Sequence, residues 1–96
     1  MKSNFNRLDE VKGTLRILII LGYSFQPVPR LELIKECKED YLGRTAFYSA
    51  HKALMELGLI EEKSETRDGK RVVLTNLKEK GKKVVTYLVG IQKLMD

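Results

Sequence analysis

Several residue types that define other classes of protein are scarce in this chain. It has 96 residues, with one cysteine, two prolines and no tryptophan. Because Cys37 is alone, no disulfide can form within the chain and no four-cysteine metal site exists, which fits a reduced, cytoplasmic setting. We expect Cys37 to be a small buried apolar residue, with a redox or intersubunit disulfide role as the alternative.

Long apolar runs are also missing. No stretch approaches the roughly 18 apolar residues that span a bilayer, and the polar first ten residues lack the apolar core of a signal peptide. The sequence therefore predicts a protein that stays inside the cell and does not enter a membrane.

Patterns typical of enzymes are absent from the sequence. No glycine-rich phosphate loop follows a strand, and no serine or cysteine nucleophile comes with a histidine and an orienting carboxylate. The single histidine, His51, has no second histidine to form a metal pair, and its spacing from Phe47 and Leu54 predicts an inward, packed, hydrogen-bonded side chain. Acidic neighbours such as Glu61 and Glu62 diverge on a regular element. We expect no enzyme, no cofactor and no metal.

Positive charge is abundant and unevenly placed. The net charge is +5. Residues 63–83 hold eight cations against three anions, whereas the rest of the chain holds ten of each sign. Such a segment suits a polyanionic partner, although a solvated lysine-rich surface is the alternative. A chain of this length makes one domain with a small core, which favours dimerisation as a supplement.

The stretch from residue 43 to residue 75 predicts a helix followed by a hairpin. Four apolar residues recur at spacings of three and four and form one stripe of a helix: Phe47, Ala50, Leu54 and Leu57. Gly58 follows at once, where a helix end favours a left-handed glycine. Residues 59–65 and 71–75 are expected to be extended, with a turn at 66–70 that contains Asp68-Gly69, a strong hairpin signal.

Polar groups suited to nucleic acid lie on the outer face of this helix and at the hairpin turn. With the stripe turned inward, the outward residues are Arg44, Thr45, Tyr48, Ser49 and Lys52, and the turn adds Arg67, Lys70 and Arg71. An α-helix fits the major groove of DNA, where an arginine fork pairs with guanine. Arg44 is the candidate base reader, with phosphate as the alternative, and Lys52 is a phosphate contact. Tyr48 either contacts the DNA backbone or is a plain exposed aromatic residue.

These segments resemble a known family. Residues 42–48 (LGRTAFY), 54–60 (LMELGLI), 67–70 (RDGK) and 73–81 (VLTNLKEKG) are similar to the winged helix-turn-helix transcription regulators of the MarR-like or PadR-like type. The resemblance covers nearly the whole chain. Gly43 stands where such recognition helices usually have a serine or threonine cap, and glycine caps acceptably. The resemblance implies a recognition helix, a DNA-binding wing and a dimer that represses by blocking polymerase.

The last helix is expected to carry the dimer interface. It should begin near Thr75 or Asn76 and end near residue 94, with more apolar surface than a three-helix core needs. The predicted interface residues are Val84, Val85, Leu88, Val89, Ile91 and Met95. In the alternative, this helix folds back along the first helix, and Val85 and Val89 complete the core.

The sequence therefore predicts a mostly helical α+β winged helix-turn-helix: a three-helix core, a two-stranded wing and a long C-terminal helix. The expected segments are a flexible tail (1–6), the DNA-binding domain (7–75) with helices at 7–22, 29–38 and 44–57, and the C-terminal helix (76–96). The function hypothesis is a sequence-specific regulator of transcription that binds double-stranded DNA, most simply as a repressor. A winged-helix module that binds proteins is the alternative. The sequence names no operator or target gene, and an effector would find room only at the dimer interface.

Overall fold

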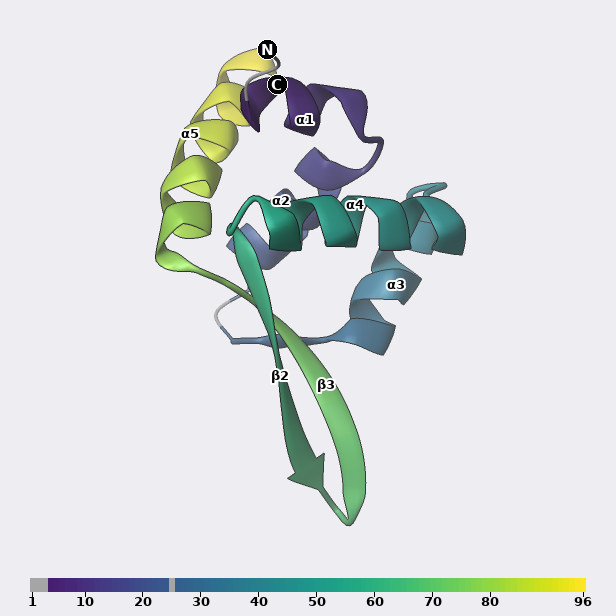
Figure 1. The fold of residues 1–96 in the computed structure, drawn as a ribbon. Coiled ribbons are helices and arrows are strands. Elements are labelled where there is room, and N and C mark those ends of the chain that lie inside the picture. Colours follow the sequence, from purple (N-terminus) through teal and green to yellow (C-terminus); the bar gives the residue numbers. More distant parts are fainter. Residues whose placement is uncertain (1–3, 25) are drawn as a thin grey trace.

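Helices and a small sheet alternate along the chain in the computed structural model, which describes residues 4–24 and 26–96 (Figure 1). The elements are α1 (Asn4–Glu10), α2 (Thr14–Gly22), β1 (Val28–Pro29), α3 (Arg30–Glu39), α4 (Arg44–Glu56), β2 (Ile60–Arg67), β3 (Lys70–Leu77) and α5 (Glu79–Met95). The mostly helical α+β class predicted from the sequence is confirmed.

The N-terminal part differs from the single helix expected at residues 7–22. Helix α1 already begins at Asn4, so residues 4–6 of the predicted tail are helical, and residues 1–3 lie outside the described part. Helix α1 ends at Glu10, and the chain turns through residues 11–13, where Gly13 has a φ of 95°. Thr14 begins α2, and its buried hydroxyl donates to the carbonyl of Leu8 at 2.8 Å. The left-handed Gly13 is the N-cap residue of α2 and redirects the chain there, in a conformation that glycine adopts at the least cost.

The ends of α3 and α4 share one motif. Gly58 has a φ of 74°, its N–H donates to Met55 O, and the N–H of Leu59 donates to Leu54 O. This is a Schellman motif, and the left-handed glycine that the sequence predicted at the helix end is confirmed. The same pattern ends α3, where the left-handed residue is Tyr41, with a φ of 65°. The predicted bounds of both helices, 29–38 and 44–57, are correct to within one residue.

The sheet is larger than the predicted two-stranded wing. Strands β2 and β3 pair from Ile60↔Leu77 to Arg67↔Lys70. Asp68 and Gly69 form the two-residue turn with φ values of 51° and 77°, as in a type I′ hairpin. Strand β1 adds a third strand to the other side of β3, in the order β1-β3-β2.

The third strand also explains why the last helix begins later in the chain than predicted. Thr75 pairs with Val28 of β1 and with Glu62 of β2 and is fully buried. A helix that begins at residue 75 or 76, as predicted, would break both pairings. Helix α5 therefore begins at Glu79, with Lys78 as its N-cap residue.

Helix α5 packs against α2 and the base of the hairpin (Figure 1). Val85 is buried in the core of the single chain, and its side chain fills the space where a Cβ at Gly22 would lie. The alternative in which the last helix completes the core therefore holds for Val85. Val84, Leu88 and Val89 are half-buried against the core, whereas Ile91 and Met95 are exposed.

Candidate nucleic-acid interface

The outer face of α4 is polar and open to solvent. Its inner stripe is buried, with Phe47, Ala50 and Leu54 all fully covered. All five predicted face residues are exposed: Arg44, Thr45, Tyr48, Ser49 and Lys52. The structure therefore brings these five side chains together on one side of one helix, as their spacing predicted.

The ring of Tyr48 is held rather than free. It packs edge-on against Phe47, with the ring centroids 5.4 Å apart, while 43% of the residue stays exposed. This contact fixes the ring and leaves its hydroxyl available to a partner. Tyr48 can therefore donate a hydrogen bond to a backbone or base group at little cost in side-chain entropy.

The start of α4 adds a positive potential to this face. Arg44 is the first helical residue, and Gly43 before it has no side chain that could cap the helix. The first amide groups of the helix therefore remain available to an external acceptor, and the helix dipole favours an anion there. At the opposite end, the acidic Glu56 is ion-paired with Arg7 of α1, which offsets the one negative charge on the exposed side of α4.

The hairpin carries the second group of cations. Every residue from 63 to 71 is exposed, and the two strands project away from the helices (Figure 1). Lys70 lies directly beside the turn. Arg67 is ion-paired with Glu65, and Arg71 Nη2 donates to Ser64 Oγ at 3.2 Å. The structure thus places the three predicted wing residues together at the hairpin tip, apart from the face of α4.

Other cations of residues 63–83 make contacts within the chain instead. Lys80 Nζ donates to the carbonyl of Leu57 at 3.3 Å, so its charge lies at the C-terminus of α4, where the helix dipole favours it. Lys82 pairs with Glu79 at 3.3 Å and Lys63 with Glu61 at 3.7 Å. The eight cations of residues 63–83 therefore do not form one surface.

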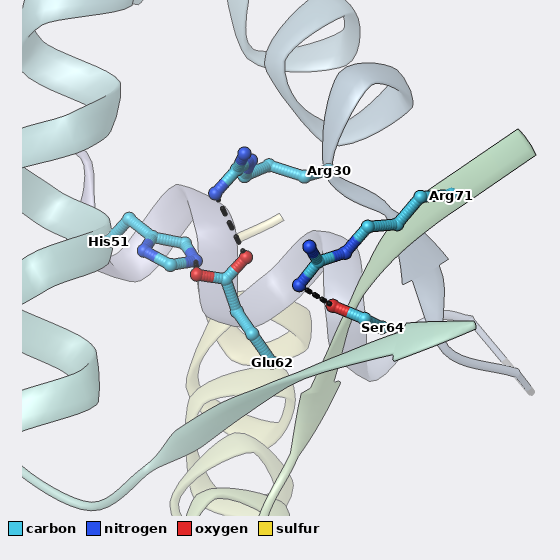
Figure 2. A network of polar contacts seen from close by, with 5 residues as sticks. All are labelled: Arg30, His51, Glu62, Ser64 and Arg71. Atoms are coloured by element: carbon cyan, nitrogen blue, oxygen red, sulfur yellow. Dashed lines mark hydrogen bonds and ion pairs between the residues drawn. The ribbon is translucent and has the colours of Figure 1, made fainter. Parts of the chain in front are cut away.

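A polar network that sequence reasoning missed joins α3, α4 and the hairpin (Figure 2). Glu62 Oε2 accepts a hydrogen bond from Arg30 Nη1 at 3.2 Å, and Glu62 Oε1 lies 3.5 Å from His51 Nε2. His51 is buried, as predicted, but its Nε2 has no hydrogen-bond partner among the described residues. No sequence signal joins these residues, because they come from three elements. The one hint is that Glu62 shares a strand face with the buried Ile60.

The titration of His51 follows from this environment. Burial lowers its pKa below the ordinary value, the nearby Glu62 carboxylate raises it in part, and Arg30 lowers it further. The imidazole is therefore neutral at neutral pH. Cys37 is fully buried, and burial raises the pKa of its thiol to about 11.

The described residues contain neither a candidate metal site nor a membrane-spanning helix. They hold no group of three or more histidine, cysteine, aspartate or glutamate side chains placed to bind a metal ion. None of the helices in this part of the chain has the length and apolar character that crossing a membrane requires.

Two solved structures resemble this one along most of the chain. A PadR-like transcription factor from Bacteroides fragilis superposes with a TM-score of 0.67 at 18% sequence identity, covering 95% of this chain and 89% of that one. A PadR family transcription regulator from Clostridium difficile R20291 gives a TM-score of 0.65 at 24% identity, covering 86% of this chain and 95% of that one.

These similarities define the fold. The chain has the winged helix-turn-helix fold, with α3 and α4 as the helix-turn-helix and β2 and β3 as the wing, which confirms the predicted resemblance at the level of structure. The sequence matches no protein-family model, and it matches no curated protein.

Proposed function

We propose that this protein is a regulator of transcription that binds double-stranded DNA, with α4 in the major groove and the hairpin on the flanking backbone or minor groove. The observation that carries the proposal is the exposed face of α4, where hydrogen-bond donors from Arg44 to Lys52 lie on one side of a rigid helix. The two similar structures are described as transcription regulators, which supports the same function for this chain.

The dimensions of the helix face suit a groove. Arg44 and Lys52 are eight residues apart, so they are separated by about 12 Å along the helix axis, or roughly three to four base pairs of B-DNA. Arg44 lies at the end with the free amide groups, where a phosphate or a guanine edge is the natural partner. Lys52 and the hairpin cations then supply contacts to phosphate, which fix the orientation on the duplex.

We further propose that two copies associate through α5 and α1. A groove of about 510 Å³ runs between these helices and the start of α2. Its walls include the exposed Phe5, Leu15, Tyr87 and Ile91. Exposed apolar patches of this kind mark interaction surfaces, and a second copy would cover it. The proposed interface retains Val84, Leu88, Val89, Ile91 and Met95 of the predicted set and omits the buried Val85.

A symmetric dimer of this kind would place its two recognition helices on half-sites about 34–36 Å apart, on a palindromic operator. Repression by blocking polymerase is the mechanism we propose for such a protein. The groove is also the place where a small-molecule effector would have room.

The dimer is tested by the molar mass in solution. Ile91→Glu puts a charge in the groove, so light scattering after size exclusion should change from the mass of a dimer to that of a monomer. Leu31→Glu is the control, because Leu31 on α3 is also an exposed apolar residue and lies outside the groove. A wild type that is monomeric at micromolar concentration would contradict this part of the proposal.

DNA binding is tested by fluorescence anisotropy with a labelled generic duplex from low to physiological salt. We expect micromolar affinity at low salt and a steep loss with salt, with a log–log slope of about −3 to −4.5 for each protomer if three to five phosphates are contacted. The double variant Arg44→Ala/Lys52→Ala should lose most of this binding. Lys82→Ala/Lys83→Ala removes the same charge from α5 and should lose much less.

The outcomes separate the two function classes. Equal losses in both double variants would mean that net charge alone drives binding and would refute the assignment of α4. Absence of binding at low salt would refute DNA as the partner and favour a protein partner for the same face.

A further inference from the structure

The hairpin leaves the body of the protein at one residue of β2. Along this strand Ile60 is buried, Glu61 and Glu62 are half-buried, and every later residue is exposed. Strand β2 is also the edge of the sheet, with β3 as its one neighbouring strand. Strand β3, in contrast, is held on its far side by β1. The base of the hairpin is therefore held by β1 on the β3 side, and on the β2 side by the contacts that the strand makes near Glu62.

The side chain of Glu62 holds this point from two sides. Its carboxylate accepts a hydrogen bond from Arg30, the first residue of α3, and faces the imidazole of His51 in the middle of α4 (Figure 2). The His51 ring is itself fixed next to Phe47, with the ring centroids 5.6 Å apart. One carboxylate thus connects the edge strand of the wing to both helices of the helix-turn-helix.

The Glu62 carboxylate is less exposed than a typical surface charge, and its charged partner is Arg30, because the His51 imidazole is neutral. The Glu62 side chain is 22% exposed and that of His51 is 8% exposed, so solvent screens them only in part. A partly buried charge is stable only with partners, and loss of one partner leaves the other uncompensated. The carboxylate therefore has a defined position, which an exposed pair would not impose.

The length of the hairpin makes this position important. Asp68 at the turn is six positions beyond Glu62, a distance of about 20 Å at ~3.3 Å per residue. A tilt of about 10° at Glu62 would move the tip by about 3.5 Å, which is enough to break any hydrogen bond there. The cations at the tip keep a fixed relation to α4 only while the base of the hairpin does not tilt.

We propose that Glu62 is a positioning residue for the DNA interface: its carboxylate, held between Arg30 and His51, fixes the wing relative to the recognition helix so that both meet the same duplex. The expected effect of Glu62 on DNA binding rests on the proposed function. The first claim of the proposal, the fixed orientation of the hairpin, concerns the free protein and can be tested separately.

The first test measures backbone residual dipolar couplings in the free full-length chain. In the wild type, one alignment tensor should fit the N–H groups of α4 and of residues 63–71 together. In Glu62→Ala the hairpin couplings should be scaled down and should need a separate tensor. Glu61→Ala is the matched control, because this neighbour points to the opposite face of the strand and should leave a single tensor.

A second readout in the same samples follows His51. It is the one histidine of the chain, so its ring resonance is unambiguous. Because the Glu62 carboxylate raises the His51 pKa, Glu62→Gln should lower that pKa further, whereas Glu61→Gln should leave it unchanged. An unchanged His51 pKa in Glu62→Gln would overturn the contact that the proposal requires.

The third test measures DNA affinity, and the direction of its change is informative. Removing a negative charge should by itself strengthen binding to a polyanion. If Glu62 positions the wing, Glu62→Ala should instead weaken binding about tenfold, the loss expected when one or two wing contacts fail. Glu62→Gln keeps an oxygen that can accept from Arg30 and should fall between wild type and Glu62→Ala. Glu61→Ala should bind as well as wild type or better.

The outcomes distinguish the two claims. A single tensor in Glu62→Ala, or DNA affinity raised to the level of Glu61→Ala, would overturn the positioning role. A wild type that binds no DNA would refute the proposed function, and the dipolar couplings would then decide the positioning claim alone. Circular dichroism melts of each variant show whether it is folded at the temperature of the measurement.

Discussion

The close approach of α5 to the base of the hairpin depends on Gly81. A Cβ added at this position would lie well within 3.0 Å of the Leu59 carbonyl oxygen and 3.2 Å from Leu77 Cδ2. The same Leu59 carbonyl accepts the hydrogen bond from the N–H of Lys78 at 2.9 Å. The first turn of α5 thus sits directly on the backbone that leads into β2, and a methyl group there has no room.

The expected effect of Gly81→Ala is a net loss of stability. Alanine in a helix interior should contribute about 1 kcal/mol relative to glycine. Against this gain, α5 must shift by about 1 Å against backbone, which costs about 2–3 kcal/mol as overpacking. Weakening the hydrogen bond to Lys78 costs about 1 kcal/mol more. The sum is a destabilisation of roughly 2–3 kcal/mol, or a fall in Tm of about 8–24 °C for a domain of this size.

Gly90→Ala is the matched control, because it lies on the same helix with no neighbouring atom within 4 Å of the added Cβ. It should raise the free energy of unfolding by about 0.5–1 kcal/mol. Urea unfolding followed by circular dichroism, at one protein concentration for all variants, measures both changes. If Gly81→Ala were as stable as Gly90→Ala, the packing of α5 on Leu59 described above would be wrong.

Three further predictions concern single residues. Tyr41 is exposed and has a left-handed φ of 65°, so Tyr41→Gly should stabilise the fold by about 0.5–1 kcal/mol, measured by urea unfolding. A loss of stability would contradict the Schellman motif at the end of α3. Burial lowers the pKa of His51 below 6.5, so the unfolded chain binds the proton first and the free energy of unfolding should fall as the pH drops through about 6.5 and below. His51→Gln should remove that part of the pH dependence, and an identical pH profile would refute the effect. Burial raises the pKa of the Cys37 thiol to about 11, so a disulfide reagent at pH 8 should label the native chain only as fast as the fold opens around this residue. Immediate labelling would place the thiol at the surface.

Local patterns in the sequence were sufficient for the central segment. The period of Phe47, Ala50 and Leu54, the glycine at position 58 and the Asp-Gly pair each act within a few residues, and the structure follows them closely. Short-range sterics decide such features, so they can be read from one stretch of chain.

Features that depend on distant partners were predicted less well. Strand β1 is two residues long and exists because β3 lies beside it, so Val28 and Thr75 carry no signal that joins them. The burial of Val85 depends on Gly22, which removes a side chain from the facing helix. The carboxylate of Glu62 meets Arg30 and His51 through three separate elements. In each case packing between elements decided the outcome rather than local propensity.

The predicted cationic surface shows the same limit. Charge in the sequence says how many cations a segment has, but not what each one contacts. Lys80 lies at the C-terminus of α4, and Arg67 pairs with Glu65, so part of the positive charge is used within the chain. The exposed face of α4 required only the helical period and was predicted in full.

The central claim, that α4 and the hairpin tip form the surface that meets DNA, is tested most directly by an amide chemical-shift titration. The isotope-labelled full-length chain would be mixed with a short duplex at low salt. The account predicts that shifts concentrate in residues 44–52 and 67–71, while the amides around Tyr87 and Ile91 in the groove of α5 stay in place. Shifts concentrated along α5 and α1, with α4 and the hairpin tip unchanged, would contradict it.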